Sequence, residues 1–137
     1  MKRPEWSWVS EDVVWAIHDE QVAEHGGLGG IRDMALVRSA LARPQNLSAY
    51  EVPDAADLAA AYAYGLARNH GFSDGNKRTA YVVALVFLLD NGYEFVGTDV
   101  ESVGMMVRVA AGEVGERQLA AWFRGAIRPA SDDAGIP

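Results

Sequence analysis

Hydrophobic residues recur at helical spacing along most of the chain. The first such stripe lies between Ser10 and about Glu24, and its apolar positions are Val13, Val14, Ile17 and Val22. Ser10 is a residue type that caps helix N-termini. The glycine-rich run 26–30 should end the helix, because glycine readily adopts left-handed backbone conformations. The pattern therefore predicts a first helix over about 10–24.

Proline and capping residues divide the next part of the chain. A second, short helix is predicted over 33–42, because Pro44 disfavours helical conformation in the residue before it. Residues 47–53 are interpreted as an exposed, extended connector. A third helix is predicted over 54–69, capped by its first residue, Asp54.

The segment from about 76 to 91 is apolar nearly all round, which is typical of a buried central helix. Its large apolar residues are Val82, Val83, Leu85, Val86, Phe87, Leu88 and Leu89. After an extended link at 93–96, a capping-box pattern opens a fifth helix over about 98–111, and a sixth covers about 116–127. The predicted fold class is all-α, a compact single-domain bundle of about six helices around the buried helix at 76–91.

Length and composition fit one small domain. The chain has 137 residues, half of them hydrophobic, and we assign the domain to 1–128 and a disordered tail to 129–137. No apolar stretch is long enough to span a bilayer, and the absence of cysteine fits a reducing cytoplasm. The net charge of −7 argues against a general nucleic-acid binder, which would present a basic face.

Residues that can carry chemistry are concentrated between His70 and Arg78, which hold a histidine, a carboxylate, a Gly-Asn pair and two adjacent cations. The first turn of the helix at 76–91 should present unpaired backbone N–H groups, which favour a bound anion. Gly75 lets an anion approach the backbone closely. Lys77 and Arg78 are unfavourable beside the positive end of a helix dipole, and a bound polyphosphate would remove that penalty.

Several of these side chains have both a structural and a chemical interpretation. Asp74 could cap the following helix or hold Mg²⁺, and Asn76 could bind phosphate or bridge the loop. His70 could end the third helix or act as a general base, and its neighbours favour the base. His18 and His25 lie seven residues apart with no accompanying ligand set, so we interpret them as packing or surface histidines.

The segment His70-x-Phe-x-Asp-Gly-Asn-Lys-Arg resembles the signature of the Fic/Doc family. With lysine at position 77 it is similar to the Doc branch, the death-on-curing toxins of toxin–antitoxin modules. Doc-like segments also occur in the same order at 17–20, 30–33, 39–45 and 87–93. The chain departs from AMP-transferring Fic proteins at Gly71, Lys77 and Tyr81, where those proteins have proline, glycine and arginine.

The resemblance implies a Fic/Doc fold and a protein kinase that transfers the terminal phosphoryl group of ATP to a threonine of elongation factor Tu, which stops translation. His70 would be the base and Asp74 the Mg²⁺ ligand, and the phosphate-binding residues would be Gly75, Asn76, Lys77 and Arg78. The resemblance also implies a cognate antitoxin and a target-docking flap at 47–53. Without the resemblance, 47–53 is a plain surface loop.

Two other functions remain open on the residues. The first is transfer of AMP or another nucleotidyl group to a protein hydroxyl, which Lys77 and Tyr81 disfavour. The second is an inhibitor that binds a partner without chemistry, and such a protein would not need His70.

Overall fold

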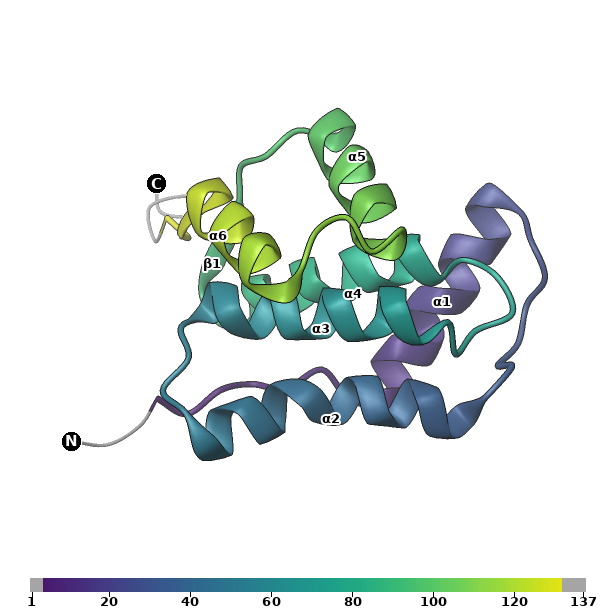
Figure 1. Ribbon diagram of the computed structural model, residues 1–137, viewed down its shortest axis with the longest axis horizontal. Helices are drawn as coiled ribbons and strands as arrows, with labels where there is room; N and C mark the ends of the chain where they lie inside the picture. Colours follow the sequence, from purple (N-terminus) through teal and green to yellow (C-terminus); the bar gives the residue numbers. More distant parts are fainter. Residues whose placement is uncertain (1–3, 132–137) are drawn as a thin grey trace, which may run out of the picture.

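A computed structural model describes residues 4–131 and shows a helical domain with a small two-stranded sheet (Figure 1). The elements are α1 (Glu11–His25), α2 (Met34–Tyr50), α3 (Ala55–Asn69), α4 (Asn76–Asp90), β1 (Tyr93–Phe95), α5 (Asp99–Ala110), α6 (Glu116–Ala126) and β2 (Ile127–Pro129). The all-α fold class is confirmed. None of the helices within 4–131 is both long enough and apolar enough to cross a bilayer.

Three helices begin where their capping residues predict. The Ser10 side chain accepts a hydrogen bond from the Val13 backbone N–H at the start of α1. Asp54 forms a reciprocal capping box with Asp57 at the start of α3. Thr98 accepts from the Glu101 backbone N–H at the start of α5. Each cap satisfies N–H groups that lack an acceptor inside the helix.

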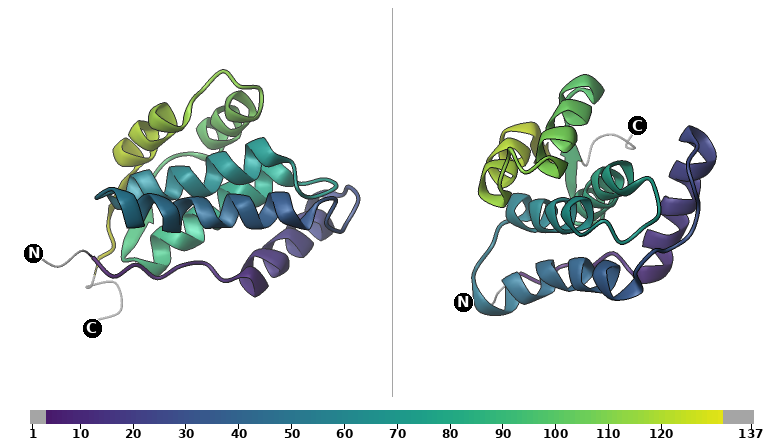
Figure 2. Two further views of the ribbon diagram at one scale, coloured as in Figure 1. Left: turned by 60° about the horizontal axis from the view of Figure 1, so that its bottom comes forward. Right: turned by 45° about the vertical axis from the view of Figure 1, so that its right-hand side comes forward.

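The second helix is longer than predicted, because α2 continues through Pro44 and ends at Tyr50. Pro44 is buried in this helix, which packs along α3 (Figure 2). The two backbones come close at Gly65, where an added Cβ would lie 3.2 Å from the Ala40 Cα. Burial of this face offsets the hydrogen bond that proline removes. The extended connector is therefore limited to 51–54, and the prediction for 47–50 was wrong.

The most deeply buried helix is α3. Eleven of its 15 residues are buried, and it contacts α2, α4, α5 and α6. The helix predicted at 76–91 is present as α4, but Leu89 on its outer face is 66% exposed. The helix α3 takes the central position because its many alanines let neighbouring helices approach closely. The hydrophobic pattern did not indicate this, because small residues contribute little to it.

The chain after α6 forms part of the fold. Pro129 in β2 lies opposite Tyr93 in β1, and the backbone N–H of Ala130 donates to the Gly92 carbonyl at 2.8 Å. The expected disordered tail at 129–137 was therefore wrong for residues 129 and 130. Residues 132–137 lie outside the described part of the chain, so the expectation for them stays a prediction.

Candidate active site

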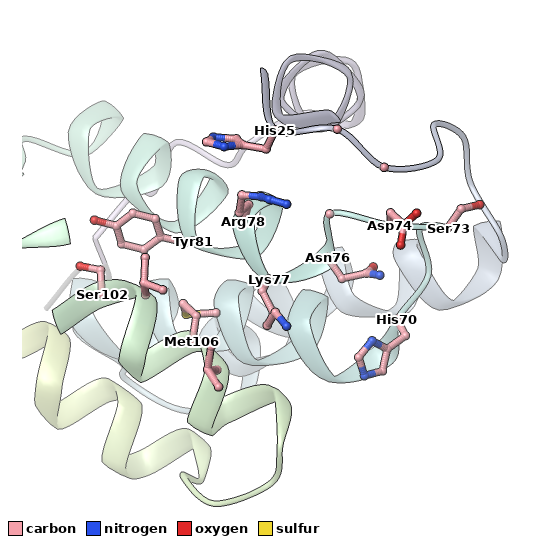
Figure 3. Close-up of a pocket in the computed structure, with 15 residues that line it drawn as sticks. His25, His70, Ser73, Asp74, Asn76, Lys77, Arg78, Tyr81, Ser102 and Met106 are labelled. Carbon is pink, nitrogen blue, oxygen red and sulfur yellow. The ribbon is translucent and has the colours of Figure 1, made fainter. Parts of the chain in front are cut away.

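The turn between α3 and α4, residues 70–78, is here called the motif turn (Figure 3). It begins at His70, which ends α3 in a left-handed conformation with φ 50° and ψ 45°. Gly75, the residue just before α4, has φ 78°, a conformation that strains residues with a Cβ. All six residues that the sequence singled out line one cleft of about 780 Å³: His70, Asp74, Gly75, Asn76, Lys77 and Arg78.

The cleft has a polar side and an apolar side (Figure 3). The polar side is the motif turn together with the end of α1, where His25 and the following two glycines lie. The apolar side is formed by α5, through Val103, Met106 and Val107. The volume suits a small molecule with one charged and one apolar end.

The start of α4 is a candidate anion-binding site, here called the open anion site. Within residues 4–131 the backbone N–H groups of Asn76, Lys77 and Arg78 have no acceptor, and Gly75 offers no capping side chain. The exposed side chains of Lys77 and Arg78 make no salt bridge in the same part of the chain. Helix N-termini attract anions, and two unpaired cations strengthen that attraction. The structure therefore presents five positively polarised or charged groups to one region of the cleft.

Asn76 bridges the loop, as one of its two interpretations predicted. Its Oδ1 accepts from the Phe72 backbone N–H, and its Nδ2 donates to the Phe72 carbonyl, both at 3.0 Å. These bonds hold the motif turn in shape. The Asn76 side chain therefore acts on the turn, while its backbone N–H remains available to an anion.

Asp74 does not cap α4, because the N-cap is Gly75 and no side chain caps this helix. Instead, Asp74 Oδ2 accepts from the Leu28 backbone N–H at 2.7 Å. Within 4–131 no donor contacts Oδ1, and the residue is exposed. This carboxylate is thus oriented through one oxygen and open at the other. The same part of the chain holds no group of three or more His, Cys, Asp or Glu side chains suited to a metal.

Residues 26–33, here called the glycine loop, brace the motif turn. The backbone N–H groups of Arg32 and Asp33 both donate to the Gly71 carbonyl, at 2.8 and 2.9 Å. Ser73 N–H donates to the Gly30 carbonyl at 3.2 Å, and Ile31 and Phe72 form an isolated β-bridge. The two segments lie side by side at one end of the domain (Figure 1).

The predicted docking flap lies elsewhere. Residues 47–50 are the last turn of α2, and only 51–54 connect it to α3. This connector precedes α3, whereas His70 follows it, and 15 residues of helix span about 22 Å. The expectation of an extended flap over 47–53 was wrong for 47–50, because α2 continues to Tyr50 and does not end near residue 42.

The sequence missed the importance of His18. It is a packing histidine, as predicted, with 2% exposure, but it packs on the motif turn: its ring stacks on Phe72, and its Nε2 lies 2.8 Å from the Asp74 carbonyl oxygen. His25 is exposed, as predicted, yet it lines the cleft. The signal in the sequence was helical spacing, which puts His18 on one face of α1 with Val14, Ile17 and Gln21. That face is buried in the structure.

Two of the departures from AMP-transferring Fic proteins have structural counterparts. A Cβ at Gly71 would lie 2.4 Å from Val37 Cγ2, so this backbone excludes proline there. Tyr81, at the position of the missing arginine, lines the cleft between α4 and α5. Burial raises the pKa of Tyr81, and its hydrogen bond with Ser102 opposes that rise.

Comparisons of the sequence with known proteins find similarity over most of the chain. The Fic/DOC family model matches residues 8–88. The chain is 35% identical over 117 residues to the protein kinase doc of Escherichia phage P1, which covers 85% of this chain and 92% of that protein. It is 47% identical over 73 residues to the toxin Doc of Mycolicibacterium smegmatis, which covers 50% of this chain and 55% of the relative. Because the family model covers more than half of the chain and the phage protein is similar over nearly its whole length, the chain belongs to the Fic/DOC family.

Proposed function

We propose that this protein is a toxin that acts as a protein kinase and transfers the terminal phosphoryl group of ATP to a protein hydroxyl. The observation that carries the proposal is the open anion site at the start of α4, which shares one cleft with His70 and Asp74. The relatives named as a protein kinase and as a toxin support it. The resemblance to Doc proteins points to a threonine of elongation factor Tu as the acceptor, and thus to inhibition of translation in the cytoplasm.

In this mechanism the cleft residues position and polarise the reactants. The open N–H groups of α4, Lys77 and Arg78 bind the phosphate oxygens and stabilise the charge that develops during transfer. Asp74, through its open Oδ1, would hold Mg²⁺ together with phosphate oxygens and water. When bound, Mg²⁺ neutralises phosphate charge.

His70 acts as the general base. The acceptor oxygen bonds to the terminal phosphorus, the bond from that phosphorus to the leaving ADP oxygen breaks, and the hydroxyl proton passes to the imidazole. His70 is exposed at the cleft and lies within the motif turn, so a protein substrate can reach it. The apolar side formed by α5 suits the nucleoside part of ATP.

We place the target protein's acceptor segment beside the glycine loop and not beside residues 47–53. The glycine loop pairs with the motif turn at Ile31 and Phe72, and Leu28 is 71% exposed. An extended target segment could bind beside it through main-chain hydrogen bonds. A cognate antitoxin completes the proposal. We expect the open reading frame immediately upstream to encode it, and co-expression of that antitoxin should restore growth.

The test is phosphoryl transfer to purified elongation factor Tu with Mg²⁺ and ATP labelled at the γ-phosphate. Wild type should label the target, and His70→Ala should not. Label that arrives from α-labelled ATP instead would replace this proposal with nucleotidyl transfer. Growth inhibition that persists in both His70→Ala and Asp74→Ala would replace it with partner binding without chemistry.

A further inference from the structure

We propose that Arg32 is a positioning residue for His70, whose guanidinium holds the His70 carbonyl and so keeps the proposed base turned toward the cleft. Arg32 Nε donates to the His70 carbonyl oxygen at 3.0 Å, and its Nη2 donates to the same oxygen. This inference rests on the proposed function for the role of His70 as a base. The contact between Arg32 and the His70 carbonyl does not depend on that function.

His70 has a backbone conformation that needs support. Among residues 4–131 it is the only non-glycine residue with positive φ. The left-handed conformation is unfavourable for residues with a Cβ, because the Cβ crowds the following carbonyl oxygen. Such residues persist where surrounding contacts hold them, and they occur at functional sites.

Arg32 supplies that support with suitable electrostatics. The His70 carbonyl lies at the C-terminal end of α3, where unpaired carbonyl groups carry partial negative charge. A guanidinium that donates two N–H groups there makes charge-assisted hydrogen bonds. Within the described residues no other side chain makes a hydrogen bond to His70.

The guanidinium is itself fixed by the backbone of the glycine loop. The Arg32 N–H donates to the Gly71 carbonyl at 2.8 Å, so the backbone and the side chain of one residue hold two successive carbonyls. The anion site at the start of α4 does not depend on these contacts. Loss of the Arg32 side chain should therefore displace His70 and leave the nucleotide site intact.

The test compares Arg32→Ala and Arg32→Lys with Arg38→Ala. Arg38 is a matched control, because it is an exposed arginine in the adjacent α2 that pairs with Glu11 on α1. The activity readout is the kcat and the KM for ATP in phosphoryl transfer to elongation factor Tu. Arg32→Ala should lower kcat by about 100-fold, as expected for a misplaced reactive group, with the KM for ATP unchanged.

Two further readouts separate positioning from general damage. Guanidinium ion should restore part of the kcat of Arg32→Ala and none of that of His70→Ala. Adding Arg32→Ala to His70→Ala should cause no further loss. Arg32→Lys keeps the charge and the loop backbone but lacks the two-pronged donor, so its kcat should be intermediate.

A structural readout keeps the inference separate from the proposed function. NMR backbone shifts and couplings of His70 should report positive φ in wild type and in Arg38→Ala, and a changed conformation in Arg32→Ala. A His70 backbone unchanged in Arg32→Ala overturns the inference, whatever the activity. If no variant transfers a phosphoryl group but the His70 backbone changes as expected, the proposed function fails and the positioning contact stands.

Discussion

The imidazole of His18 lies flat against the ring of Phe72, with centroids 3.9 Å apart and planes inclined by 11°, and its Nε2 lies 2.8 Å from the Asp74 carbonyl oxygen. One buried side chain of α1 thus contacts the motif turn at two points. Phe72 is also buried against Trp15, at 6.1 Å between ring centroids. The turn that carries the residues proposed to bind phosphate is therefore packed against aromatic rings, although Lys77 and Arg78 are themselves exposed.

The variant His18→Phe tests whether the contact between His18 and the Asp74 carbonyl stabilises the motif turn. The ring stack is retained, but the Asp74 carbonyl loses its contact with Nε2, so the free energy of unfolding should fall by about 1–2 kcal/mol. Amide hydrogen exchange at residues 72–76 should become faster. The control His25→Phe changes an exposed ring and should alter stability by less than about 0.5 kcal/mol. Equal stability and exchange in wild type and His18→Phe would show that the contact does not hold the turn.

Gly71→Ala should destabilise the domain through a steric clash. The new Cβ would lie 2.4 Å from Val37 Cγ2 and 2.9 Å from the Val37 backbone nitrogen, and the backbone nitrogen cannot rotate away. We expect a loss of about 1–3 kcal/mol in urea denaturation. Gly125→Ala is the control, because a Cβ there meets nothing within 4 Å in α6, and it should add about 0.5–1 kcal/mol. A neutral Gly71→Ala would contradict the close approach of α2.

Thr79→Val should stabilise the protein. The Thr79 hydroxyl on α4 is fully buried and has no hydrogen-bond partner within the described residues. Replacing it with a methyl group of similar size removes an unsatisfied polar atom, a gain of about 1 kcal/mol in thermal or urea unfolding. Thr79→Ser keeps the hydroxyl and loses a methyl group, so it should lower stability by about 1 kcal/mol. A destabilised Thr79→Val would show that the hydroxyl is in fact satisfied.

ATP with Mg²⁺ should stabilise the folded wild type by mass action and so raise its melting temperature. At a ligand concentration of 100 times the Kd, the gain in the free energy of unfolding is about 2.7 kcal/mol. Lys77→Ala removes one unpaired cation from the anion site and should weaken binding by about tenfold, which lowers that stabilisation by about 1.4 kcal/mol at the same ligand concentration. Differential scanning calorimetry measures both. Arg38→Ala should match wild type. An undiminished shift in Lys77→Ala would mean that this side chain does not meet the phosphates.

The ion pair between Asp54 and Arg124 should make the free energy of unfolding depend on pH in the acid range. The hydrogen bond from Arg124 is the main cause that lowers the pKa of Asp54 from 3.8 to about 2. The ionised form is favoured in the folded state, so this stabilisation is present above about pH 4 and is lost as pH falls toward 2. Because the Asp54 side chain is 52% exposed, solvent limits the effect to about 1 kcal/mol.

The Arg124→Ala variant isolates this pair, because it leaves the Asp54 cap of α3 in place. The free energy of unfolding should fall less between pH 5 and pH 2 in Arg124→Ala than in wild type, while other carboxyl groups titrate alike in both. Urea denaturation at each pH measures the difference. Parallel pH curves would show that the Arg124 contact does not shift the Asp54 titration.

The local sequence was sufficient to predict those features that depend only on residues close together in the chain, such as the helix starts. The caps at Ser10, Asp54 and Thr98 were predicted correctly, because each bonds a backbone N–H only three residues away. The end of α2 was not, because Pro44 lies in a helix that is stabilised by its face against α3. The same limit misplaced the central helix, since the alanines of α3 are buried by what surrounds them.

The sequence alone determined the helical class, the capped helix starts and the grouping of His70, Asp74 and the residues proposed to bind phosphate, because each of these features depends on residues within a few positions of one another. Only the tertiary structure decided what holds that group in place. His18 is 56 residues from Asp74, and Arg32 is 38 residues from His70. Such contacts form only when the packing of α1, α2 and α3 brings the segments together, and no local pattern encodes that approach.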